Sequence, residues 1–248
     1  MSESDARLAA RLAEQAGRLL LEIRSGSGLT GKELGKRGDR DSNELLLREL
    51  AAARPDDAVL SEESADSPQR LSAERVWIID PLDGTREYGM PPRDDWAVHV
   101  ALWQDGGGIT DAAVAQPSLD AVYATDTAHA TADGTGRRLR FLVSDSRPPV
   151  WAQAVSDALD AELAPMGSAG AKGMAVLRGD ADAYLHAGGQ WEWDSAAPVG
   201  VAVAAGLHAS RIDGSPLVYN SEHPYLPDLL ICRAELEDAL LHAIAAAS

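Results

Sequence analysis

The chain has 248 residues, of which 45% are hydrophobic, and it carries a formal net charge of -17 from 39 acidic and 22 basic residues. This length and composition are typical of a globular protein with a sizeable core and exclude a largely disordered chain. The charge argues against a nucleic-acid polymer as the ligand, because contacts to a phosphate backbone need a basic face.

No apolar run approaches the ~20 residues that cross a bilayer, so we expect no membrane partner. The first residues, Met-Ser-Glu-Ser-Asp, lack the basic start and apolar block of a secretory signal. We therefore expect a cytoplasmic protein. The single cysteine, Cys232, follows an apolar run and is expected to be a buried thiol without a chemical role.

In the first half of the chain, apolar residues at three- and four-residue spacing predict an amphipathic helix from Asp5 to about Arg24. A second helix is predicted from about Asp41 to Ala53. Segments rich in apolar and β-branched residues then predict an antiparallel sheet that these helices cover. The expected strands are Ala58–Leu60, Val76–Ile79, Trp96–Leu102, Thr110–Ala115 and Ala121–Ala124.

Residues 128–138 are rich in Thr, Gly, Ala and Asp without apolar periodicity, which predicts a surface loop between two subdomains. We place the boundary between residues 1–136 and residues 137–248. In the second part, helices and strands alternate, as in an α/β unit. The expected strands are Leu139–Val143, Ala181–His186 and Leu229–Ile231, and the expected helices are Val150–Leu159, Ala169–Leu177, Ser195–Ala205 and one that begins near Ala234.

The most informative segment is residues 77–85, where an apolar strand runs into Asp80, Pro81, Asp83 and Gly84. Proline and glycine interrupt a strand, so both aspartates are expected together at its carboxyl end. Crowded carboxylates raise each other's pKa unless a cation neutralises them, and Mg²⁺ prefers such oxygen ligands. Taken alone, however, this pattern is more often a solvated turn.

Two further segments contain candidate carboxylates. Glu62 and Glu63 follow a predicted strand, and Asp194 stands where a helix begins. Asp194 is as good a helix N-cap as it is a metal ligand. Together with the first segment they supply four carboxylates, which is the inventory of a two-metal site. Residues 167–170, Gly-Ser-Ala-Gly, could receive an anion at a helix start, although a plain loop is slightly favoured there.

Residues 77–88, Trp-Ile-Ile-Asp-Pro-Leu-Asp-Gly-Thr-Arg-Glu-Tyr, resemble the signature of the inositol monophosphatase superfamily of magnesium-dependent, lithium-sensitive phosphatases. Residues 193–197 resemble its second signature and residues 61–64 its Glu-Glu element, in the family's order and approximate spacing. Within the superfamily, the Glu-Tyr ending and residues 167–172 look most like the CysQ branch of 3'(2'),5'-bisphosphate nucleotidases.

The resemblance implies the layered α-β-α-β-α sandwich of the inositol monophosphatase and fructose-1,6-bisphosphatase fold. An α+β part, residues 1–136, would carry most metal ligands, and an α/β part, residues 137–248, would carry Asp194 and the substrate contacts. The implied activity is Mg²⁺-dependent removal of the 3'-phosphate of 3'-phosphoadenosine 5'-phosphate (PAP), which gives AMP and links the protein to sulfate assimilation. Alternatives are an inositol-1-phosphate or fructose-1,6-bisphosphate phosphatase, and a metal-dependent nucleotide-binding regulator without turnover. The oligomeric state stays open, with a homodimer as one option.

The resemblance also implies a ligand set. Glu62, Asp80 and the carbonyl of Leu82 would hold one Mg²⁺, and Asp80, Asp83 and Asp194 a second, with Asp80 bridging. Two ions about 3.5–4 Å apart can stabilise both the attacking and the leaving oxygen. A third, weaker ion would touch Glu62, and Li⁺ would compete at one position.

Catalytic roles fall, by the same resemblance, on Thr85, Glu62 and Asp83, with Thr85 orienting the water. The phosphate would lie against the amides of Gly84 and Thr85 at the start of a short helix. The implied substrate contacts are Gly84, Thr85, Gly167, Ser168, Ala169, Lys172 and Asp194. Trp191 and Trp193 either line a pocket for an adenine ring or pack beside Asp194, whereas His99 and His186 are expected to be core or supporting residues rather than ligands.

One segment departs from the family pattern. Residues 31–39 are Gly-Lys-Glu-Leu-Gly-Lys-Arg-Gly-Asp, in which Asp39 fits the final aspartate of the pattern. The upstream acid that helps Thr85 position water has no clear counterpart; Glu33 is a candidate, and Lys36 stands where a threonine is usual. Whether Glu33 or Asp39 supports a third metal ion stays open. A mobile, solvated loop is an equally good interpretation of this segment.

Overall fold

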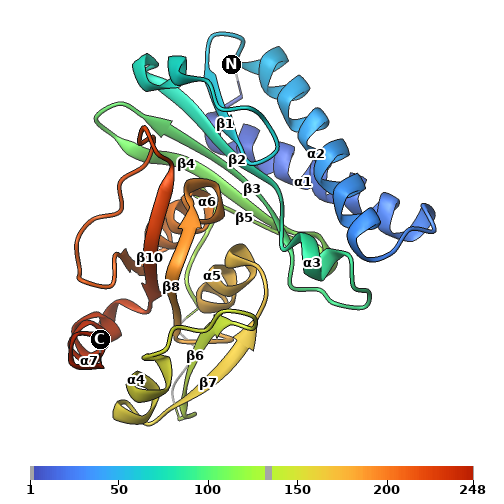
Figure 1. The fold of residues 1–248 in the computed structure, drawn as a ribbon. Coiled ribbons are helices and arrows are strands. Elements are labelled where there is room, and N and C mark those ends of the chain that lie inside the picture. The colour runs from blue at the N-terminus through green and yellow to red at the C-terminus, as the bar shows by residue number, and fades with distance from the viewer. Residues whose placement is uncertain (1–2, 132–135, 248) are drawn as a thin grey trace.

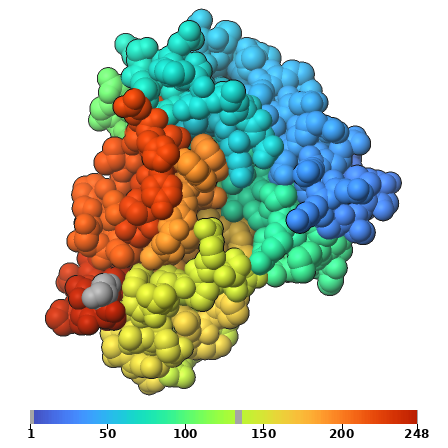
Figure 2. Space-filling model, in the orientation of Figure 1, coloured from blue at the N-terminus to red at the C-terminus, as the bar shows by residue number. Residues whose placement is uncertain are grey.

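The computed structural model describes residues 3–131 and 136–247. Helices and sheets alternate in five layers (Figure 1), so the predicted layered sandwich is confirmed. The blue-to-green first part of the chain and the yellow-to-red second part lie side by side across the molecule (Figure 2). Among the described residues, no helix is both long and apolar enough to span a bilayer.

Two long helices form the first layer, α1 (Asp5–Gly26) and α2 (Gly31–Ala53). The side chain of Ser4 caps α1 by accepting a hydrogen bond from the amide of Arg7 at 3.4 Å. The predicted amphipathic helix is confirmed, and its apolar face packs on the first sheet. This face buries Leu8, Leu12, Ala13, Ala16, Leu20 and Ile23.

The first sheet has the strand order β1-β2-β3-β4-β5, in which β1 and β2 are parallel and the other neighbours antiparallel. All strands predicted for this half are present. The sheet is covered by α1 on one face and by α6 (Glu192–Ala204) on the other, which explains why the middle of β2, residues 76–79, is apolar without alternation. The strands are β1 (Ala58–Ser61), β2 (Arg75–Asp83), β3 (Ala97–Gln104), β4 (Gly108–Gln116) and β5 (Ala121–Ala124).

A β-bulge carries β2 past Pro81, where the strand was predicted to stop. Asp80 pairs with His99 and Asp83 with Ala97, so three steps along β2 face two along β3. In a regular strand, side chains three residues apart point to opposite faces, and the extra residue brings the two aspartates to the same side. Proline is tolerated at such a position because a bulge leaves an amide unpaired. The short helix α3 (Thr85–Tyr88) follows directly.

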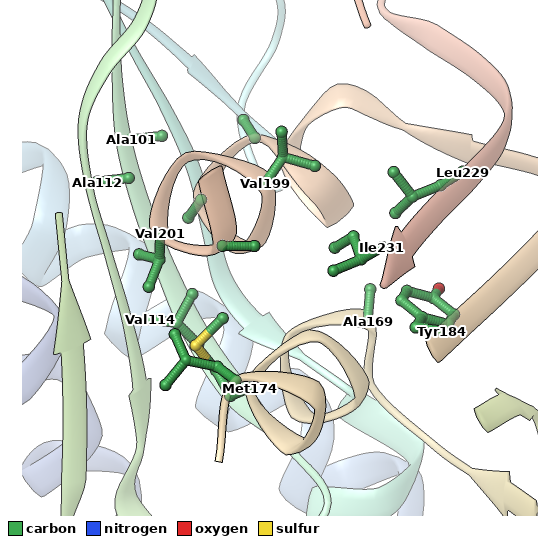
Figure 3. Packing of buried hydrophobic residues seen from close by; sticks show 14 of the residues in the cluster. Ala101, Ala112, Val114, Ala169, Met174, Tyr184, Val199, Val201, Leu229 and Ile231 are labelled. Atoms are coloured by element: carbon green, nitrogen blue, oxygen red, sulfur yellow. The ribbon is translucent and has the colours of Figure 1, made fainter. Parts of the chain in front are cut away.

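The central layer consists of α5 (Ala169–Leu177) and α6 (Glu192–Ala204), which lie between the two sheets (Figure 3). Small residues let these helices approach the strands closely: a Cβ on Gly200 would lie 2.7 Å from the Cγ2 of Ile109. The buried cluster draws on both sheets and both helices. It includes Ala101, Ala112, Val114, Ala169, Met174, Tyr184, Val199, Val201, Leu229 and Ile231.

The second sheet has the order β7-β6-β8-β10-β9, with β6 parallel to β7 and β8 and the remaining pairs antiparallel. Apolar side chains of its outer face pack against α4 and α7, which form the last layer. The elements are β6 (Leu139–Ser144), α4 (Ala152–Ala158), β7 (Ala161–Met166), β8 (Ala183–Trp191), β9 (His208–Ser210), β10 (Tyr225–Cys232) and α7 (Glu237–Ala247). Short 3₁₀ helices lie at Pro68–Ser72, Pro117–Leu119 and Ala234–Leu236.

The glycine-rich segment 31–38 is helical, so its interpretation as a mobile loop is wrong. Helix α2 begins at Gly31 rather than near Asp41. Glycine lowers helix propensity, but here it serves close packing: a Cβ on Gly35 would lie 2.7 Å from the Cγ2 of Thr85. Tertiary contact therefore outweighs the local preference.

Two edge strands, β7 and β9, were not predicted. The segment Ala161–Met166 has no β-branched residue, and its pairing with β6 decides its conformation. In addition, β8 extends beyond His186, and α6 begins at Glu192 rather than Ser195. Of the predicted loop, residues 128–131 and 136–138 form no helix or strand, and the rest lies outside the described residues. The subdomain boundary stays a prediction.

The contact between Gly35 and Thr85 can be tested by mutation. Gly35→Ala adds a methyl group 2.7 Å from the Thr85 side chain, and overpacking of this kind costs roughly 1–3 kcal/mol. We expect a lower melting temperature in calorimetry. The matched control is Gly26→Ala, because a Cβ at that helix position meets nothing within 4 Å, and alanine should leave stability equal or higher. Equal melting temperatures for the two variants would contradict the packing role.

Candidate metal centre

Three of the predicted ligands, Asp80, Asp83 and Asp194, come together where the bulge of β2 meets the start of α6. Each offers a carboxylate oxygen, and these oxygens lie within 4.8 Å of one another. The first two residues are buried and the third is half-buried. Hard divalent cations bind oxygen ligands gathered in this way, so the cluster could hold a metal ion.

Asp80 lies at the centre of the cluster and is only 1% exposed. Its Oδ1 accepts a hydrogen bond from the amide of Leu82 at 3.0 Å, whereas Oδ2 has no hydrogen-bond partner among the described residues. Burial, followed by Glu62, Asp83 and Asp194, raises the pKa of this carboxyl group well above its usual range. A buried carboxylate oxygen without a partner is costly, and a bound cation would satisfy it. The donor set therefore fits a metal ion.

Asp83, in contrast, is held ionised. Its Oδ2 accepts hydrogen bonds from Ser168 and from the amide of Gly170 at 2.7 Å, and lies 3.2 Å from Nε2 of His99. Burial raises the pKa of Asp83, but His99 and the hydrogen bonds outweigh burial and bring that pKa to about 2. Nδ1 of His99 contacts the carbonyl of Trp193 at 3.1 Å. His99 therefore contacts a predicted ligand, Asp83, and is not itself part of the carboxylate cluster.

Asp194 is the third residue of α6, not its N-cap. One carboxylate oxygen accepts a hydrogen bond from the amide of Trp191 at 2.6 Å, so the residue satisfies a helix-terminal amide. Burial, followed by the charge of Asp83, raises its pKa to about 6. The N-cap position predicted for Asp194 is therefore wrong, although its side chain does accept from a helix-terminal amide, and its role as a metal ligand stays a prediction.

Glu62 directly follows β1, and the parallel pairing of β1 with β2 brings it towards Asp80. The residue as a whole is exposed, but its carboxyl group is desolvated: burial, followed by Asp194, raises its pKa to about 8. Asn43 of α2 holds this segment in place, since its Oδ1 accepts a hydrogen bond from Ser61 at 2.8 Å. Glu62 therefore lies at the edge of the cluster, close enough for the charge of Asp194 to raise the pKa of its carboxyl group.

The acid beside Thr85 is Asp39. The Thr85 hydroxyl lies 3.1 Å from Oδ1 of Asp39 and 3.1 Å from the carbonyl of Leu82. Burial, followed by Glu63, raises the pKa of Asp39 to about 7. Glu33 is exposed near the start of α2. The sequence left this partner ambiguous because the helix that carries Asp39 towards Thr85 was not predicted there.

A cavity of about 330 Å³ opens beside the cluster. Among the predicted residues, its wall includes Asp83, Thr85, Gly167, Ser168, Ala169, Lys172 and Asp194. Gly84 lies just outside this wall and adopts a left-handed conformation with φ +85°, which favours glycine. The roles of Gly84 and of these wall residues as substrate contacts or metal ligands stay predictions.

Lys172 has a structural role in addition to its place in the wall. Its ammonium group donates hydrogen bonds to the carbonyls of Gly167 and Ser168, each at 2.7 Å, and to that of Met166 at 3.3 Å. Burial lowers its pKa to about 8. All three donors thus hold the loop that positions Ser168 against Asp83.

Several residues of the cavity wall were missed by the sequence analysis. The loop after β6, Ser-Asp-Ser-Arg at residues 144–147, contributes Asp145 and Arg147, and β8 contributes Gln190. Arg86 forms ion pairs with Glu87 and Asp145. Among the described residues, the guanidinium of Arg147 has no hydrogen bond or ion pair. The only sequence feature that could have indicated this loop is its polar Ser-Asp-Ser-Arg segment directly after a buried strand.

The two tryptophans pack on each other rather than in the cavity. The rings of Trp191 and Trp193 stack with centroids 5.4 Å apart, and His223 and Tyr225 contact the edge or face of Trp191. Neither tryptophan lines the cavity described above. The structure therefore supports the packing interpretation.

The crowded carboxyl groups predict how stability depends on pH when no divalent cation is bound. Asp194, Asp39 and Glu62 have folded-state pKa values of about 6, 7 and 8, above the unfolded values of about 4. The unfolded chain then binds fewer protons than the folded one, so the free energy of unfolding falls as pH rises from about 4 to 8. His99, with its raised pKa, acts in the same direction above about pH 6.5. His186, whose pKa burial lowers to about 4, opposes this trend below about pH 6.5. Calorimetry in chelator should therefore show the melting temperature falling most clearly between about pH 6.5 and 8.

Asp80→Asn is the matched variant for this experiment. It replaces the central carboxyl group, whose ionisation is disfavoured, by a neutral amide, so it should raise the melting temperature in chelator at neutral pH. It should also abolish the rise in melting temperature that we expect a divalent cation to produce in the unmodified protein. A melting temperature in chelator that increased with pH would contradict the predicted repulsion.

Comparison with known proteins agrees with this geometry. Residues 2–247 match the model of the inositol monophosphatase family. The chain is 58% identical over 238 residues to the 3'-phosphoadenosine 5'-phosphate phosphatase of Mycobacterium bovis, covering 93% of this chain and 89% of that relative. It is 32% identical over 201 residues to the 3'(2'),5'-bisphosphate nucleotidase CysQ of Escherichia coli, covering 76% and 80%.

Solved structures show the same fold. The crystal structure of CysQ from Bacteroides thetaiotaomicron has a TM-score of 0.78 at 24% identity and covers 93% of this chain and 97% of that one. That of inositol monophosphatase II from Staphylococcus aureus has a TM-score of 0.78 at 19% identity and covers 96% and 92%. A family match along almost the whole chain, over the fold and carboxylate cluster described above, establishes that this protein belongs to the inositol monophosphatase family.

Proposed function

We propose that this protein hydrolyses the 3'-phosphate of PAP, giving AMP and phosphate, in a Mg²⁺-dependent reaction that serves sulfate assimilation. The names of the Mycobacterium bovis and Escherichia coli relatives support this activity. The carboxylate cluster beside a 330 Å³ cavity supplies a place for the reaction. A phosphomonoester and water are consumed, an ester P–O bond is broken, and the new P–O bond comes from water.

The observation that favours a substrate with two anionic groups is the free guanidinium of Arg147. The wall of the cavity contains the cluster of aspartates and also Arg147, Arg86 and Lys172. Arg86 is occupied by ion pairs and Lys172 by three carbonyls. Arg147 alone of these cations has no side-chain partner among the described residues, so it is available for a second phosphate. A charge-assisted hydrogen bond to phosphate is stronger than one between neutral groups.

Metal binding falls to the predicted ligand set: Glu62, Asp80, Asp83, Asp194 and the carbonyl of Leu82, for two or three Mg²⁺ ions. When bound, such ions neutralise the carboxylates, lower the pKa of water and stabilise the leaving oxygen. The structure of the chain supports this assignment through the unpartnered Oδ2 of Asp80 and the short distances within the cluster.

In this proposal, Thr85 and Asp39 accept the proton of the attacking water. The Thr85 hydroxyl donates its proton to Asp39 at 3.1 Å, which leaves its lone pairs free to accept a hydrogen bond from water. A general base works best when its pKa lies near the operating pH, and that of Asp39 is about 7. The water proton can therefore pass to Thr85 Oγ1 while the Thr85 proton passes to Asp39. Because this pair is complete, we favour an enzyme over a nucleotide-binding regulator without turnover.

A substrate panel tests the proposal. Phosphate release in Mg²⁺ is measured with PAP, inositol 1-phosphate and fructose 1,6-bisphosphate, with Asp83→Asn as the inactive control. We expect PAP to have the highest kcat/KM. A clear preference for inositol 1-phosphate or fructose 1,6-bisphosphate would overturn the assignment in favour of those phosphatases, and no release from any substrate would favour the nucleotide-binding regulator.

Arg147→Gln sharpens the test. Loss of a hydrogen bond to a charged group costs roughly 1.5–3 kcal/mol, so we expect KM for PAP to rise about 10- to 100-fold and that for inositol 1-phosphate to stay unchanged. The control is Arg140→Gln on β6, the strand that precedes the Arg147 loop, because Arg140 is exposed and pairs with Glu162 at 3.3 Å. Equal effects of Arg147→Gln on both substrates would contradict a contact to the second phosphate.

Mg²⁺ and Li⁺ provide a separate test of the metal assignment. We expect phosphate release to require Mg²⁺. We also expect it to fall when tens of millimolar Li⁺ are added, because Li⁺ in place of Mg²⁺ at one of the two positions neutralises less of the negative charge of the carboxylates. K⁺ at the same concentration controls for screening of surface charges. If K⁺ inhibited as strongly as Li⁺, competition at a specific position would be excluded.

Cellular location and assembly stay predictions. We propose a cytoplasmic protein that binds a small phosphorylated nucleotide and no membrane; its single cysteine, Cys232, is buried and free, which suits a reducing compartment. Cell fractionation tests the location. The homodimer is an option that sedimentation analysis would decide.

A further inference from the structure

Gln190 is a buried polar side chain for which the fold supplies no partner. It is the second-to-last residue of β8, is only 6% exposed, and forms part of the wall of the 330 Å³ cavity. Neither Oε1 nor Nε2 of its amide has a hydrogen-bond partner among the described residues. Its backbone is fixed, because it pairs with Leu226 of β10.

An amide in this state needs an explanation, because most buried polar side chains are hydrogen-bonded and an unmade bond is costly. Gln116 at the end of β4 shows the usual arrangement: it is 2% exposed, and its Oε1 accepts a hydrogen bond from Arg178. The neighbouring His186 does not serve Gln190, since its Nε2 contacts the carbonyl of Gly189 at 3.1 Å. Both amide atoms are themselves buried behind the cavity wall, so the side chain must rotate towards the cavity before a ligand there can supply the partner.

The position of Gln190 indicates which part of a substrate it meets. The next residue, Trp191, donates its amide proton to Asp194 at 2.6 Å, and Asp194 belongs to the carboxylate cluster. Gln190 therefore lies beside the place where the scissile phosphate is expected. An amide offers a donor and an acceptor together, and a hydroxyl group can satisfy either one. In PAP, the hydroxyl next to the 3'-phosphate is the ribose 2'-hydroxyl.

We propose that Gln190 is a specificity-determining residue that hydrogen-bonds the sugar hydroxyl adjacent to the scissile phosphate. The inference rests on the proposed function, since it takes PAP as the substrate. Gln190 thereby selects ribonucleotides over 2'-deoxyribonucleotides, while metal ions held by the aspartates would bind the phosphate.

The test compares PAP with its 2'-deoxy analogue on the unmodified enzyme and on Gln190→Met, which keeps the length and removes both polar atoms. The unmodified enzyme should prefer PAP in kcat/KM by about 2- to 12-fold, the range for a hydrogen bond between neutral groups. Gln190→Met should lose this preference through a higher KM for PAP, with the value for the deoxy analogue unchanged. A preference that Gln190→Met retains in full would overturn the inference.

A second measurement separates a ligand contact from a structural one. Because the Gln190 amide has no partner in the fold, Gln190→Met should keep or raise the melting temperature of the protein without substrate. Gln116→Met is the matched control, since it breaks the contact to Arg178 and should lower the melting temperature without altering the preference. A lowered melting temperature for Gln190→Met with unaltered preference would assign the amide a structural role and reject the inference.

The analogue of PAP with hypoxanthine in place of adenine distinguishes a contact to the base from one to the sugar. If Gln190→Met changed discrimination between the two bases and not between ribose and deoxyribose, the hydroxyl assignment would be wrong. Failure of the proposed function is recognised separately, because the unmodified enzyme would then release no phosphate from PAP.

Discussion

Four carboxyl groups crowd into one partly buried place, and their mutual repulsion is the constraint around which the rest of the structure is arranged. Burial and neighbouring charges raise the pKa values of Asp80, Asp194 and Glu62. Asp83 alone is held ionised, by His99, Ser168 and Gly170. The fold thus keeps one carboxylate of the cluster charged, and cations bound by the proposed ligands would neutralise the others, so that metal binding would also contribute to stability.

Each helix and strand around the carboxylate cluster positions one or more of its side chains. The bulge of β2 places two aspartates on one side of a strand, the parallel partner β1 delivers Glu62, and the first turn of α6 delivers Asp194. The glycines of α2 allow that helix to lie against the bulge, so that Asp39 reaches Thr85. The opposite wall of the cavity comes from the loop after β6 and from β8, where the side chains of Arg147 and Gln190 have no hydrogen-bond partner among the described residues. One wall therefore carries the carboxylate cluster, and the other carries the two side chains for which we propose substrate contacts.

Much of the fold could be predicted because its signals are local. Helix α1 and the strands of the first sheet were predicted correctly from the spacing of their apolar residues. This spacing is a property of residues that are close together in the sequence. The start of α2 and the edge strand β7 could not be predicted in this way. Glycine in a helix and alanine in a strand are locally unfavourable, and only contacts with Thr85 and with β6 stabilise them.

For the site, the order of the residues alone supplied the acidic inventory and the expectation of a metal-dependent phosphatase, because the resemblance of three short motifs is a property of the chain and not of its shape. Only the tertiary structure decided which acid contacts Thr85. Asp39, rather than Glu33, lies beside the Thr85 hydroxyl because α2 is helical from Gly31. The same holds for Lys172, whose donors are taken by carbonyls, and for Gln190, whose donors are not. Hydrogen-bond satisfaction depends on groups far apart in the chain, so only the folded structure decides it.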